Sequence, residues 1–557
     1  MTRQQQTVLI LGAGINGAAS ARELALQGLS VCMVDTADVS AGATAYSSRL
    51  IHGGLRYLEY GEWALVRESL AERSRLLRYA PQFVKPLRLS IPVTNRFGGL
   101  WQAVCRIWGK EVKSHRPRGL WTVRLGLWFY ELFGRDPLLL GCTAQRADDR
   151  RAQFPRHPDY RWWCSYDDAQ IQYAERFVIS LLRDAQQLAA ERGSGFELWT
   201  YHQAQRRGAE VRIVSNDSPH QTVKTLSPAV VINATGAWVD ETLQQWEINT
   251  PLQMGGTKGS HFLTSQAKLR GLVAQHGIYA EAEDGRPVFI LPFGEHVLVG
   301  TTDIPFDGDP RTARASKHEL DYLLHTVNHI LPEVRLTQQD IDQHYSGVRP
   351  LPAARGQKAS AITRRHWLQE HADTAWPIYS VIGGKLTTCR SLAEQTAHII
   401  LQRLNHKSWG NTRERYIPGA ENYPATNSEL RKVQQALAVE QQCSVKQVAA
   451  VWKLCGSLTK DFIKNLSDEE RISVSGTYFP RGFVKRVMGD EWVKNLEDVV
   501  ERRLMLVFSH PLSRQTLLEL AALLVDAGRI SADQVDQSVE ETCRRLHDQF
   551  GKNVVTS

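Results

Sequence analysis

The sequence predicts an α/β fold followed by a C-terminal all-α domain. Three observations lead to this prediction: a strand, glycine-rich turn and helix occupy the first 35 residues, similar strand-to-turn segments recur near residues 230 and 380, and short amphipathic helices dominate after about residue 413. A chain of 557 residues is long enough for about three or four domains. We therefore expect several domains rather than one compact core.

The first element is a Rossmann-type strand-turn-helix unit. The apolar run TVLIL (7–11) is followed by a GxGxxG turn and then by a helical pattern. Gly12 permits the tight turn, Gly14 lets the backbone approach a pyrophosphate, and Gly17 allows close packing of the helix. The N–H groups at the start of the helix, next to Asn16, favour an anion. The turn is thus predicted to bind the pyrophosphate of a dinucleotide.

A second strand ends at Asp35, at the usual distance from the turn for a carboxylate that accepts hydrogen bonds from a ribose. This motif fits NAD and FAD alike. VVINATG (230–236) and IYSVIGGKLTTCRSL (378–392) decide between them. Each segment alone is compatible with an ordinary strand-to-helix turn. A long cofactor such as FAD, however, needs contacts from distant segments and a helix N-terminus near its flavin pyrimidine. We expect FAD, with contacts at Thr235, Gly236, Gly384, Leu386 and Thr387.

The motif SSRLIHGGLRYLE (47–59) closely resembles the FAD-dependent glycerol-3-phosphate dehydrogenases of the aerobic, membrane-associated type. The resemblance continues through NATGAWV, KGSHF, VGTTD, YSGVRPL and GGKLTT, and GDEWVKNLEDVVERR (489–503) resembles the helical domain of that family. It implies further cofactor contacts at Ser48, Arg49, His52, Gly53 and Gly54.

The chain departs from that family's pattern at several positions. Asp35 stands where Glu is commoner, Arg49 where Lys is commoner, and Cys389 where Tyr is frequent. IPGAENYP (417–424) differs from the glycine-rich linker of the family, and residues from about 95 to 114 look like an insertion. The first two changes preserve charge, so we expect the flavin site to be retained.

The resemblance implies oxidation of sn-glycerol 3-phosphate to dihydroxyacetone phosphate, with hydride transfer to FAD. Such a reaction needs cations that orient the phosphate. Arg56 and Arg349 lie in glycine-flanked turns, and a guanidinium fork suits phosphate oxygens. The resemblance places both at the substrate, with Tyr57 and Lys385 beside them, and Lys258 is a further candidate contact.

The reaction also needs a base for the hydroxyl proton. Among Arg349, Lys258, Lys385 and His261, arginine is almost never deprotonated and lysine requires a large downward pKa shift, whereas histidine requires almost none. We predict His261 as the base, with Arg349 holding the oxygen and Lys385 completing the catalytic set. The segment VFILPFGEHVLVGTTD (288–303) is interpreted as a structural hairpin beneath the site, with Asp303 and Thr302 as the candidate functional exceptions.

These signals divide the chain into three predicted domains. The FAD-binding domain is discontinuous and comprises residues 1–90, 200–250 and 345–412. An antiparallel-sheet substrate or cap domain comprises residues 91–199 and 251–344. The helical domain, residues 413–557, has no recognisable catalytic motif. It is interpreted as an accessory domain and a candidate for forming a homodimer.

Within the cap domain, residues 96–130 form a basic, aromatic segment. Its part RFGGLWQAVCRIWGKEVKSHRPRGLWTVR (96–124) carries seven Lys or Arg against one acid. Trp101, Val104, Cys105 and Trp108 share one helical face, which suits a membrane interface. Covering of the protein's own core is an equal alternative on pattern alone. Because the resembling enzymes pass electrons to membrane quinone, we expect peripheral binding to an anionic membrane on its cytoplasmic side.

Composition limits the other possibilities. The eight cysteines form no CxxC pair, and no metal site is expected. The net charge of +8 favours anionic partners. No RNA-binding module accompanies the basic segment, so we expect no nucleic-acid partner, although an RNA-associated flavoprotein is an alternative. Within enzymes, the alternative is a related flavin oxidase that uses oxygen or acts on another hydroxy or amino acid.

Overall fold

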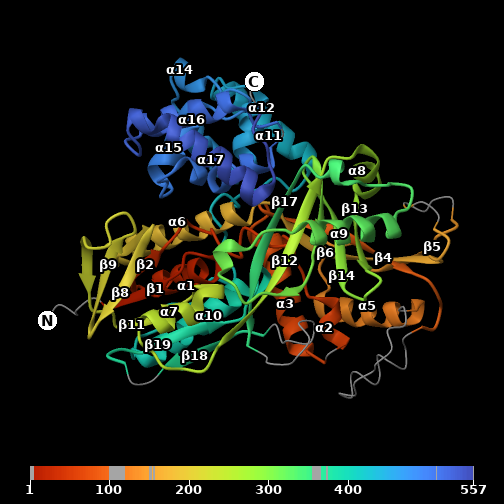
Figure 1. The fold of residues 1–557 in the computed structure, drawn as a ribbon, viewed down its shortest axis with the longest axis horizontal. Helices are drawn as coiled ribbons and strands as arrows, with labels where there is room; N and C mark the ends of the chain where they lie inside the picture. Colours follow the sequence, from red (N-terminus) through yellow and green to blue (C-terminus); the bar gives the residue numbers. More distant parts are fainter. Residues whose placement is uncertain are drawn as a thin grey trace.

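The computed structural model describes residues 6–59, 61–98, 119–149, 154, 157–353, 365–371, 374–509 and 511–555, without the side chains of residues 56 and 59. Two sheets lie at opposite ends of the main body, and a helical domain packs over both (Figure 1). The predicted fold class, α/β with a C-terminal all-α domain, is confirmed.

A six-stranded sheet forms one end of the body. Its order is β18-β19-β11-β1-β2-β7, and all neighbours are parallel except β18 and β19. The strands are β1 Thr7–Leu11, β2 Ser30–Asp35, β7 Phe196–Thr200, β11 Val230–Asn233, β18 Trp367–His371 and β19 Ile378–Ile382. The continuous apolar runs seen in the sequence match strands that are buried on both faces.

Helices cover this sheet. α1 (Ile15–Leu26) packs against α6 (Ala174–Arg192) and α10 (Cys389–Arg403), and short α7 (Val239–Gln245) follows β11. A small antiparallel sheet of β8 (His202–Arg207), β9 (Glu210–Ser215) and β10 (Thr222–Leu226) lies beside β2.

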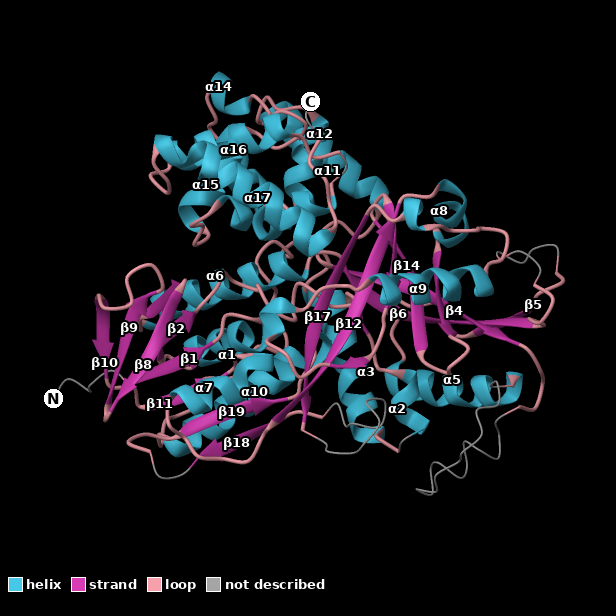
Figure 2. Cartoon of the chain, viewed as in Figure 1, coloured by secondary structure: helices cyan, strands magenta, loops and turns pink. Residues whose placement is uncertain are grey.

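A larger, mainly antiparallel sheet forms the other end (Figure 2). Its path is β16-β12-β15-β14-β13-β4-β6-β3, with β17 paired to β12 and β5 to β6, and only the β13–β4 pair is parallel. The strands are β3 Leu50–Ile51, β4 Val84–Val93, β5 Thr143–Arg146, β6 Trp162–Ile171, β12 Met254–Thr264, β13 His276–Glu281, β14 Pro287–Phe293, β15 His296–Gly300, β16 Ile304–Pro305 and β17 Gln343–Pro352.

Helices α8 (Ala267–Val273) and α9 (Lys317–Ile330) bury apolar residues against this sheet. Helices α2 (Leu55–Glu59), α3 (Trp63–Tyr79) and α5 (Leu120–Gly134) cluster between the sheets and below the larger one (Figure 1). The predicted hairpin over 288–303 forms as β14 and β15, with Gly294 at a φ of +59° in its turn.

The C-terminal domain is helical. Its helices are α11 Asn427–Glu440, α12 Val445–Cys455, α13 Thr459–Ile463, α14 Asp468–Arg471, α15 Arg481–Asp490, α16 Arg514–Asp526 and α17 Val535–Phe550, with a π-helical turn at Asp498–Arg503. Four helical segments of this domain begin with a capping box, as at Thr426 and Ser444. α17 contacts β17, and the π-helical turn contacts α6.

The predicted FAD-binding and cap domains both include segments that belong with the other sheet. Residues 91–199 were expected in the cap domain, but α6 packs on α1 and β7 pairs with β2, so residues 174–199 belong with the six-stranded sheet. Conversely, β3, most of β4 and β17 were expected in the FAD-binding domain but are strands of the larger sheet. Local apolar periodicity predicts a strand but does not specify its distant neighbour, which explains both errors.

Candidate functional site

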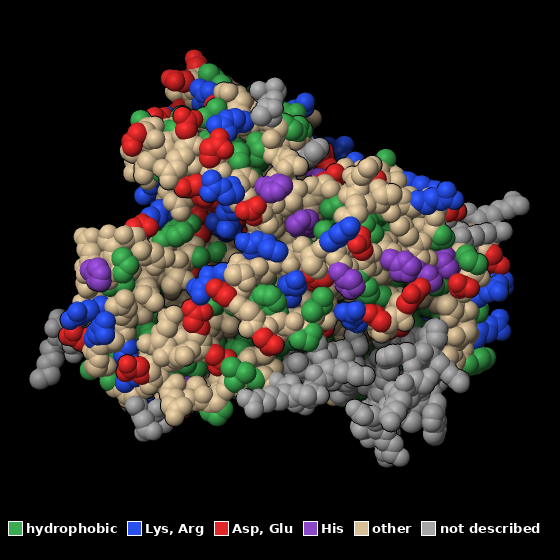
Figure 3. Space-filling view, in the orientation of Figure 1, with side chains coloured by type: hydrophobic (Ala, Val, Ile, Leu, Met, Phe, Trp, Pro, Cys, Tyr) green, Lys and Arg blue, Asp and Glu red, His purple; other side chains and the backbone are tan. Residues whose placement is uncertain are grey.

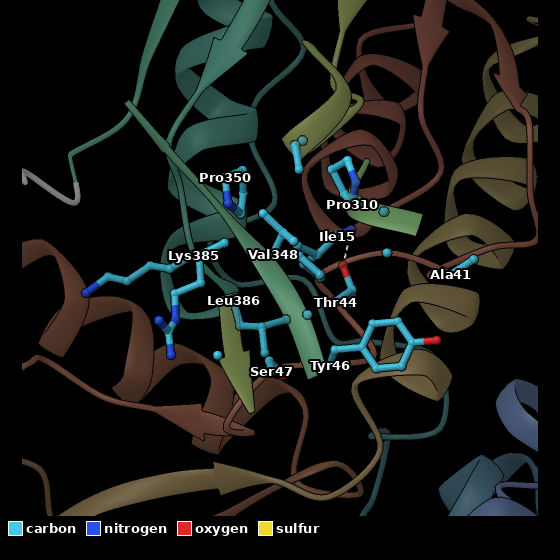
Figure 4. Close-up of a pocket in the computed structure, with 18 of the residues that line it drawn as sticks. Ile15, Ala41, Thr44, Tyr46, Ser47, Pro310, Val348, Pro350, Lys385 and Leu386 are labelled. Carbon is cyan, nitrogen blue, oxygen red and sulfur yellow. Dashed lines mark hydrogen bonds between the residues drawn. The ribbon is translucent and has the colours of Figure 1, made fainter. Parts of the chain in front are cut away.

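One large cavity, about 1490 Å³ in volume, runs between the two sheets. Such a volume exceeds the roughly 300–1,000 Å³ of an ordinary ligand pocket. Its walls come from the glycine turn, the loop after β2, the end of β11, the strands β12 and β17, and the turn before α10. Figure 4 shows residues from these segments around the same hollow, including Thr44, Val348, Lys385 and Leu386.

The glycine turn has the geometry that a pyrophosphate site needs. Gly12 has a φ of +99°, and a Cβ there would lie 2.7 Å from the carbonyl oxygen of Ala234. A Cβ on Gly17 would overlap the carbonyl oxygen of Gly12, so Gly17 packs the helix against the turn instead of lining the cavity. A Cβ on Gly14 would meet only the Thr44 hydroxyl, at 3.5 Å, which leaves the cavity side of the turn open.

Asp35 lies at the end of β2 and holds this turn. Its carboxylate accepts hydrogen bonds from the backbone N–H of Ala13 at 2.6 Å and of Ala37 at 2.8 Å. Burial raises the pKa of Asp35 to about 6, and the neighbouring Asp38 carboxylate adds to this effect. Asp35 also lines the cavity, so a ribose at this end would meet a carboxylate whose charge changes just below neutral pH.

The opposite end of the cofactor region is formed by the turn between β19 and α10. Gly383 and Gly384 have φ values of +74° and +91°, and Leu386 begins the first helical turn after them. The hydroxyl of Thr387 accepts a hydrogen bond from the backbone N–H of His52 at 3.1 Å, which ties this turn to the segment before α2. Free N–H groups at such a helix start stabilise developing negative charge.

The cavity gathers most of the residues expected to bind the cofactor. Those that line it are Gly12, Gly14, Asn16, Asp35, Ser48, Arg49, His52, Gly54, Thr235, Gly236, Gly384, Leu386 and Thr387. The remaining two, Gly17 and Gly53, do not. Gly53 lies behind the wall, where its N–H donates to the hydroxyl of Tyr130 at 2.8 Å.

Arg49, one of the expected cofactor contacts, has a guanidinium that is bonded to protein partners. It forms two hydrogen bonds with Glu175, at 2.7 and 2.9 Å, and also donates to the carbonyl oxygens of Gln172 and Ala45. The exposed fraction of its side chain is 0% and that of Glu175 is 2%. Arg49 therefore braces the loop against α6, although it also lines the cavity.

His261, on β12, lines the cavity and is almost completely buried. One ring nitrogen, Nε2, lies 2.8 Å from the hydroxyl of Ser48, and the ring stacks on Tyr345 with centroids 4.9 Å apart. Burial lowers the pKa of His261 well below its usual value, and the charges of Arg349 and Arg49 lower it further. The imidazole is therefore neutral at pH 7.

Arg349, on β17, reaches the same region. Its guanidinium donates to Asp303 at 2.7 Å, to the Thr301 hydroxyl at 2.8 Å and to the carbonyl oxygen of Thr302 at 3.0 Å. Asp303 and Thr301 also line the cavity. Asp303 thus orients Arg349 and offsets part of its charge, a role that the sequence analysis left open for this aspartate.

Lys258 and Lys385 were both expected at the substrate, but the structure separates them. The ammonium of Lys258 lies 2.8 Å from Glu319 on α9, and Lys258 does not line the cavity. Lys385 does line it and lies over the ring of Tyr57, 4.9 Å from the ring centre. Lys258 and His261 are three residues apart on one strand and so face opposite sides. Period-two alternation along the strand is the sequence signal that could have separated these two side chains.

Some expectations fall on residues that are not described. The side chain of Arg56 is among these, and so is most of the proposed interfacial helix, including Trp101, Val104, Cys105 and Trp108. The following helix, α5, is described, and its exposed face is apolar: Trp121, Leu125, Trp128 and Leu132 have exposed fractions of 48 to 62%. No helix in the described part of the chain is long and apolar enough to span a bilayer.

The sequence analysis missed the part of the wall that the C-terminal domain supplies. Arg502, Arg545 and Gln549 line the cavity together with Tyr46 of the loop after β2. It also missed Thr44, whose hydroxyl accepts a hydrogen bond from the N–H of Ile15 at 3.1 Å, drawn as a dashed line in Figure 4. The motif DVVERR contains Arg502, but its contact with a loop more than 450 residues earlier leaves no local signal.

Comparisons with known proteins agree with this geometry. A family model described as FAD dependent oxidoreductase matches residues 7–390. A glycerol-3-phosphate dehydrogenase of Synechocystis sp. is 35% identical over 75% of this chain and 74% of its own. A D-erythritol 1-phosphate dehydrogenase of Brucella abortus is 28% identical over 89% of this chain and 93% of its own.

Among solved structures, the glycerol-3-phosphate dehydrogenase from Bacillus halodurans, complexed with FAD, superposes with a TM-score of 0.70 at 19% identity. The alignment covers 99% of this chain and 96% of that one, so the likeness of fold extends through the C-terminal helical domain.

Proposed function

Since this chain belongs to the FAD-dependent oxidoreductase family and, within it, to the glycerol-3-phosphate dehydrogenases, we propose that it oxidises sn-glycerol 3-phosphate to dihydroxyacetone phosphate and passes the electrons to membrane quinone. The observation that carries the substrate half of this proposal is the meeting of His261, Arg349, Lys385 and Tyr57 in the cavity that also contains the glycine turn.

The residues present fit FAD. The open face of the Gly12–Gly17 turn suits the pyrophosphate, the Asp35 carboxylate suits a ribose, and the start of the turn before α10 suits the flavin pyrimidine. When bound, FAD supplies a hydride acceptor. The chain's own task is then to orient an alcohol, to take its proton and to neutralise a phosphate.

His261 takes the hydroxyl proton in this proposal. Its neutral imidazole is a proton acceptor at pH 7, and Ser48 restricts the ring through the bond at Nε2. The sequence analysis favoured histidine because its ordinary pKa lies near neutrality. In the structure, burial and the charge of Arg349 disfavour the imidazolium form of His261. The same charge of Arg349 stabilises the negative charge that develops on the alkoxide oxygen as the proton leaves.

Lys385 and Arg349 bind the phosphate, with Tyr57 beside Lys385. Arg349, which Asp303 holds at 2.7 Å, and Lys385 together supply positive charge for the phosphate. The proposed contact from Arg56 would add to it.

The test is to mix FAD-saturated protein anaerobically with sn-glycerol 3-phosphate and to follow the flavin absorbance. Rapid bleaching is expected with sn-glycerol 3-phosphate. D-erythritol 1-phosphate, the substrate named for the Brucella relative, is tested in parallel as the alternative substrate. Absence of bleaching with sn-glycerol 3-phosphate would refute the substrate assignment. Readmission of air then separates a dehydrogenase, which reoxidises slowly without quinone, from an oxidase.

The quinone half of the proposal requires contact with a membrane, and α5 supports it. Trp121, Leu125, Trp128 and Leu132 follow helical i, i+4, i+7, i+11 spacing, so they form one apolar stripe. Arg124 lies over the ring of Trp121, 5.2 Å from its centre, as suits a helix lying in an anionic interface on the cytoplasmic side.

Vesicle flotation with phosphatidylglycerol-containing liposomes tests membrane binding. Trp128→Glu, or removal of residues 96–114, should move the protein out of the lipid fraction. Trp409→Ser is the control, because Trp409 is 58% exposed but lies outside the stripe. Unchanged flotation of both stripe variants would refute the proposal. Binding to RNA that is steeply salt-dependent and needs no lipid would favour the nucleic-acid alternative.

A further inference from the structure

A buried charge cluster joins the C-terminal domain to the loop that leaves β2. Asp38 lies in this loop, three residues after Asp35, and its side chain is 0% exposed. Arg503 donates to both of its carboxylate oxygens, at 2.6 and 2.7 Å, and Arg502 donates through Nε at 2.6 Å. The two guanidinium groups hold the pKa of Asp38 well below its usual range. Asp38 thus shares one buried site with two arginines that lie 464 and 465 positions later in the sequence.

The cluster contains further ion pairs and hydrogen bonds. Arg502 also contacts Asp498 at 3.0 Å and Glu501 at 2.6 Å. Asp498 in turn accepts a hydrogen bond from the hydroxyl of Tyr201, at the junction of β7 and β8. Both arginines lie in the π-helical turn Asp498–Arg503, a local distortion that is frequent at functional sites.

The loop that Asp38 anchors is the loop that shapes the adenosine end of the cavity. Its residue Ala37 donates its N–H to Asp35 at 2.8 Å and accepts a hydrogen bond from the N–H of Tyr201 at 3.2 Å. Ser40 donates to the carbonyl oxygen of Ala13, in the glycine turn, at 3.1 Å. The arginines are therefore connected to the proposed ribose and pyrophosphate contacts through one short, hydrogen-bonded loop.

The cluster also borders the cavity directly. Asp38 and Arg502 line it, together with Asn495 and Glu497 from the segment just before the arginines. In Figure 1 the C-terminal domain lies above the six-stranded sheet, and Figure 3 shows Lys and Arg side chains along the junction between this domain and the body. The helical domain thus forms part of the wall, which a separate accessory domain would not do.

We propose that the C-terminal helical domain completes the FAD site, with Arg502 and Arg503 as positioning residues that hold the loop 36–40, and with it Asp35, in the conformation that receives the adenosine ribose. FAD binding and docking of the helical domain are then coupled, and each strengthens the other. This inference rests on the FAD cofactor of the family and does not depend on the identity of the substrate.

A second buried pair provides the matched control. Arg176 on α6 contacts Glu491 of the C-terminal domain at 2.5 and 3.0 Å, and both side chains are at most 3% exposed. Neither residue lines the cavity. Loss of the Arg176 side chain removes one buried contact with the same domain but leaves the bonds of Arg502 and Arg503 to Asp38, and with them the loop 36–40, in place.

The experiment is titration of apoprotein with FAD, followed by flavin fluorescence, for Arg502→Gln, Arg502→Lys and Arg176→Gln. Arg502→Gln should weaken FAD binding by about tenfold or more, within the usual range of coupling between sites. Arg502→Lys, which keeps the charge, should recover part of the affinity, and Arg176→Gln should change it by less than about threefold. Equal affinities for Arg502→Gln and wild type, or equal losses in both glutamine variants, would overturn the proposal.

A measurement on the unmodified chain covers the case in which Arg502→Gln does not fold. Limited proteolysis of the wild-type apoprotein and holoprotein should show FAD slowing cleavage between the helical domain and the body. Identical cleavage rates would overturn the coupling. Neither readout uses sn-glycerol 3-phosphate, so failure of that compound to bleach the flavin would leave this inference standing, and the reverse also holds.

Discussion

Replacement of Arg49 distinguishes a cofactor ligand from a structural brace. The sequence places Arg49 within a motif expected to bind FAD, whereas the structure commits its guanidinium to Glu175, Gln172 and Ala45. Arg49→Met removes one partner of a buried ion pair and leaves Glu175, at 2% side-chain exposure, without its counter-charge. We expect a large loss of stability and no specific loss of FAD affinity.

The magnitude follows from burial and bond count. Leaving one buried charge uncompensated costs about 3–5 kcal/mol. Arg49→Lys keeps the charge but cannot reproduce the two parallel bonds to Glu175 or both carbonyl contacts, so the expected loss is about 1–3 kcal/mol. Replacing both partners, Arg49→Met with Glu175→Met, should restore part of the stability, because the stranded carboxylate is then absent.

The assay is urea denaturation of the FAD-saturated variants, followed by tryptophan fluorescence, together with FAD titration of each folded apoprotein. Arg146→Met is the control, since its partner Asp148 is 56% exposed and no measurable change is expected. If Arg49→Met unfolds at the same urea concentration as wild type but binds FAD tenfold more weakly, the reasoning from the ion pair is refuted.

Three further predictions concern the cavity. Burial raises the pKa of Asp35 to about 6, and the ionised carboxylate is the form that accepts hydrogen bonds from the ribose. FAD affinity should therefore fall as the pH drops below about 6, by up to tenfold per pH unit. Asp35→Asn should abolish this pH dependence in an FAD titration from pH 7.5 to 5. Gly17→Ala places a Cβ against the carbonyl oxygen of Gly12, and should yield protein purified with little FAD, as judged by its absorbance spectrum. Lys385→Met should raise KM for sn-glycerol 3-phosphate at least tenfold. Lys258→Met should mainly lower thermal stability, because Lys258 pairs with Glu319 outside the cavity. Equal effects of the two variants on KM would contradict this separation.

The sequence analysis was most accurate where the relevant residues are close along the chain. The turn from Gly12 to Gly17, flanked by β1 and α1, and the paired glycines before α10 form as expected. Each combines a buried strand with residues whose backbone conformation or lack of a side chain the turn requires. These requirements on backbone conformation and side-chain size are local, so the sequence shows them without knowledge of the fold.

The sequence does not show which of several available partners a charged side chain contacts. Lys258 and Arg49 both carry charges suited to an anionic ligand, but each meets a carboxylate from a distant helix, Glu319 and Glu175. The face of β12 that reaches the cavity and the position of α6 determine these pairings. Composition and motif cannot specify them, because the attraction between charges acts only after packing has brought the elements together.

By itself, the sequence determined the dinucleotide turn, the class of fold and the helical character of the C-terminal domain, since these follow from chirality, side-chain periodicity and glycine geometry within short segments. Only the tertiary structure decided which cations face the cavity and that Arg502 and Arg503 grip Asp38. The physical reason is that burying a charge is too costly unless an opposite charge or hydrogen-bond partner lies within contact distance. The packing of whole domains determines which groups come within that distance.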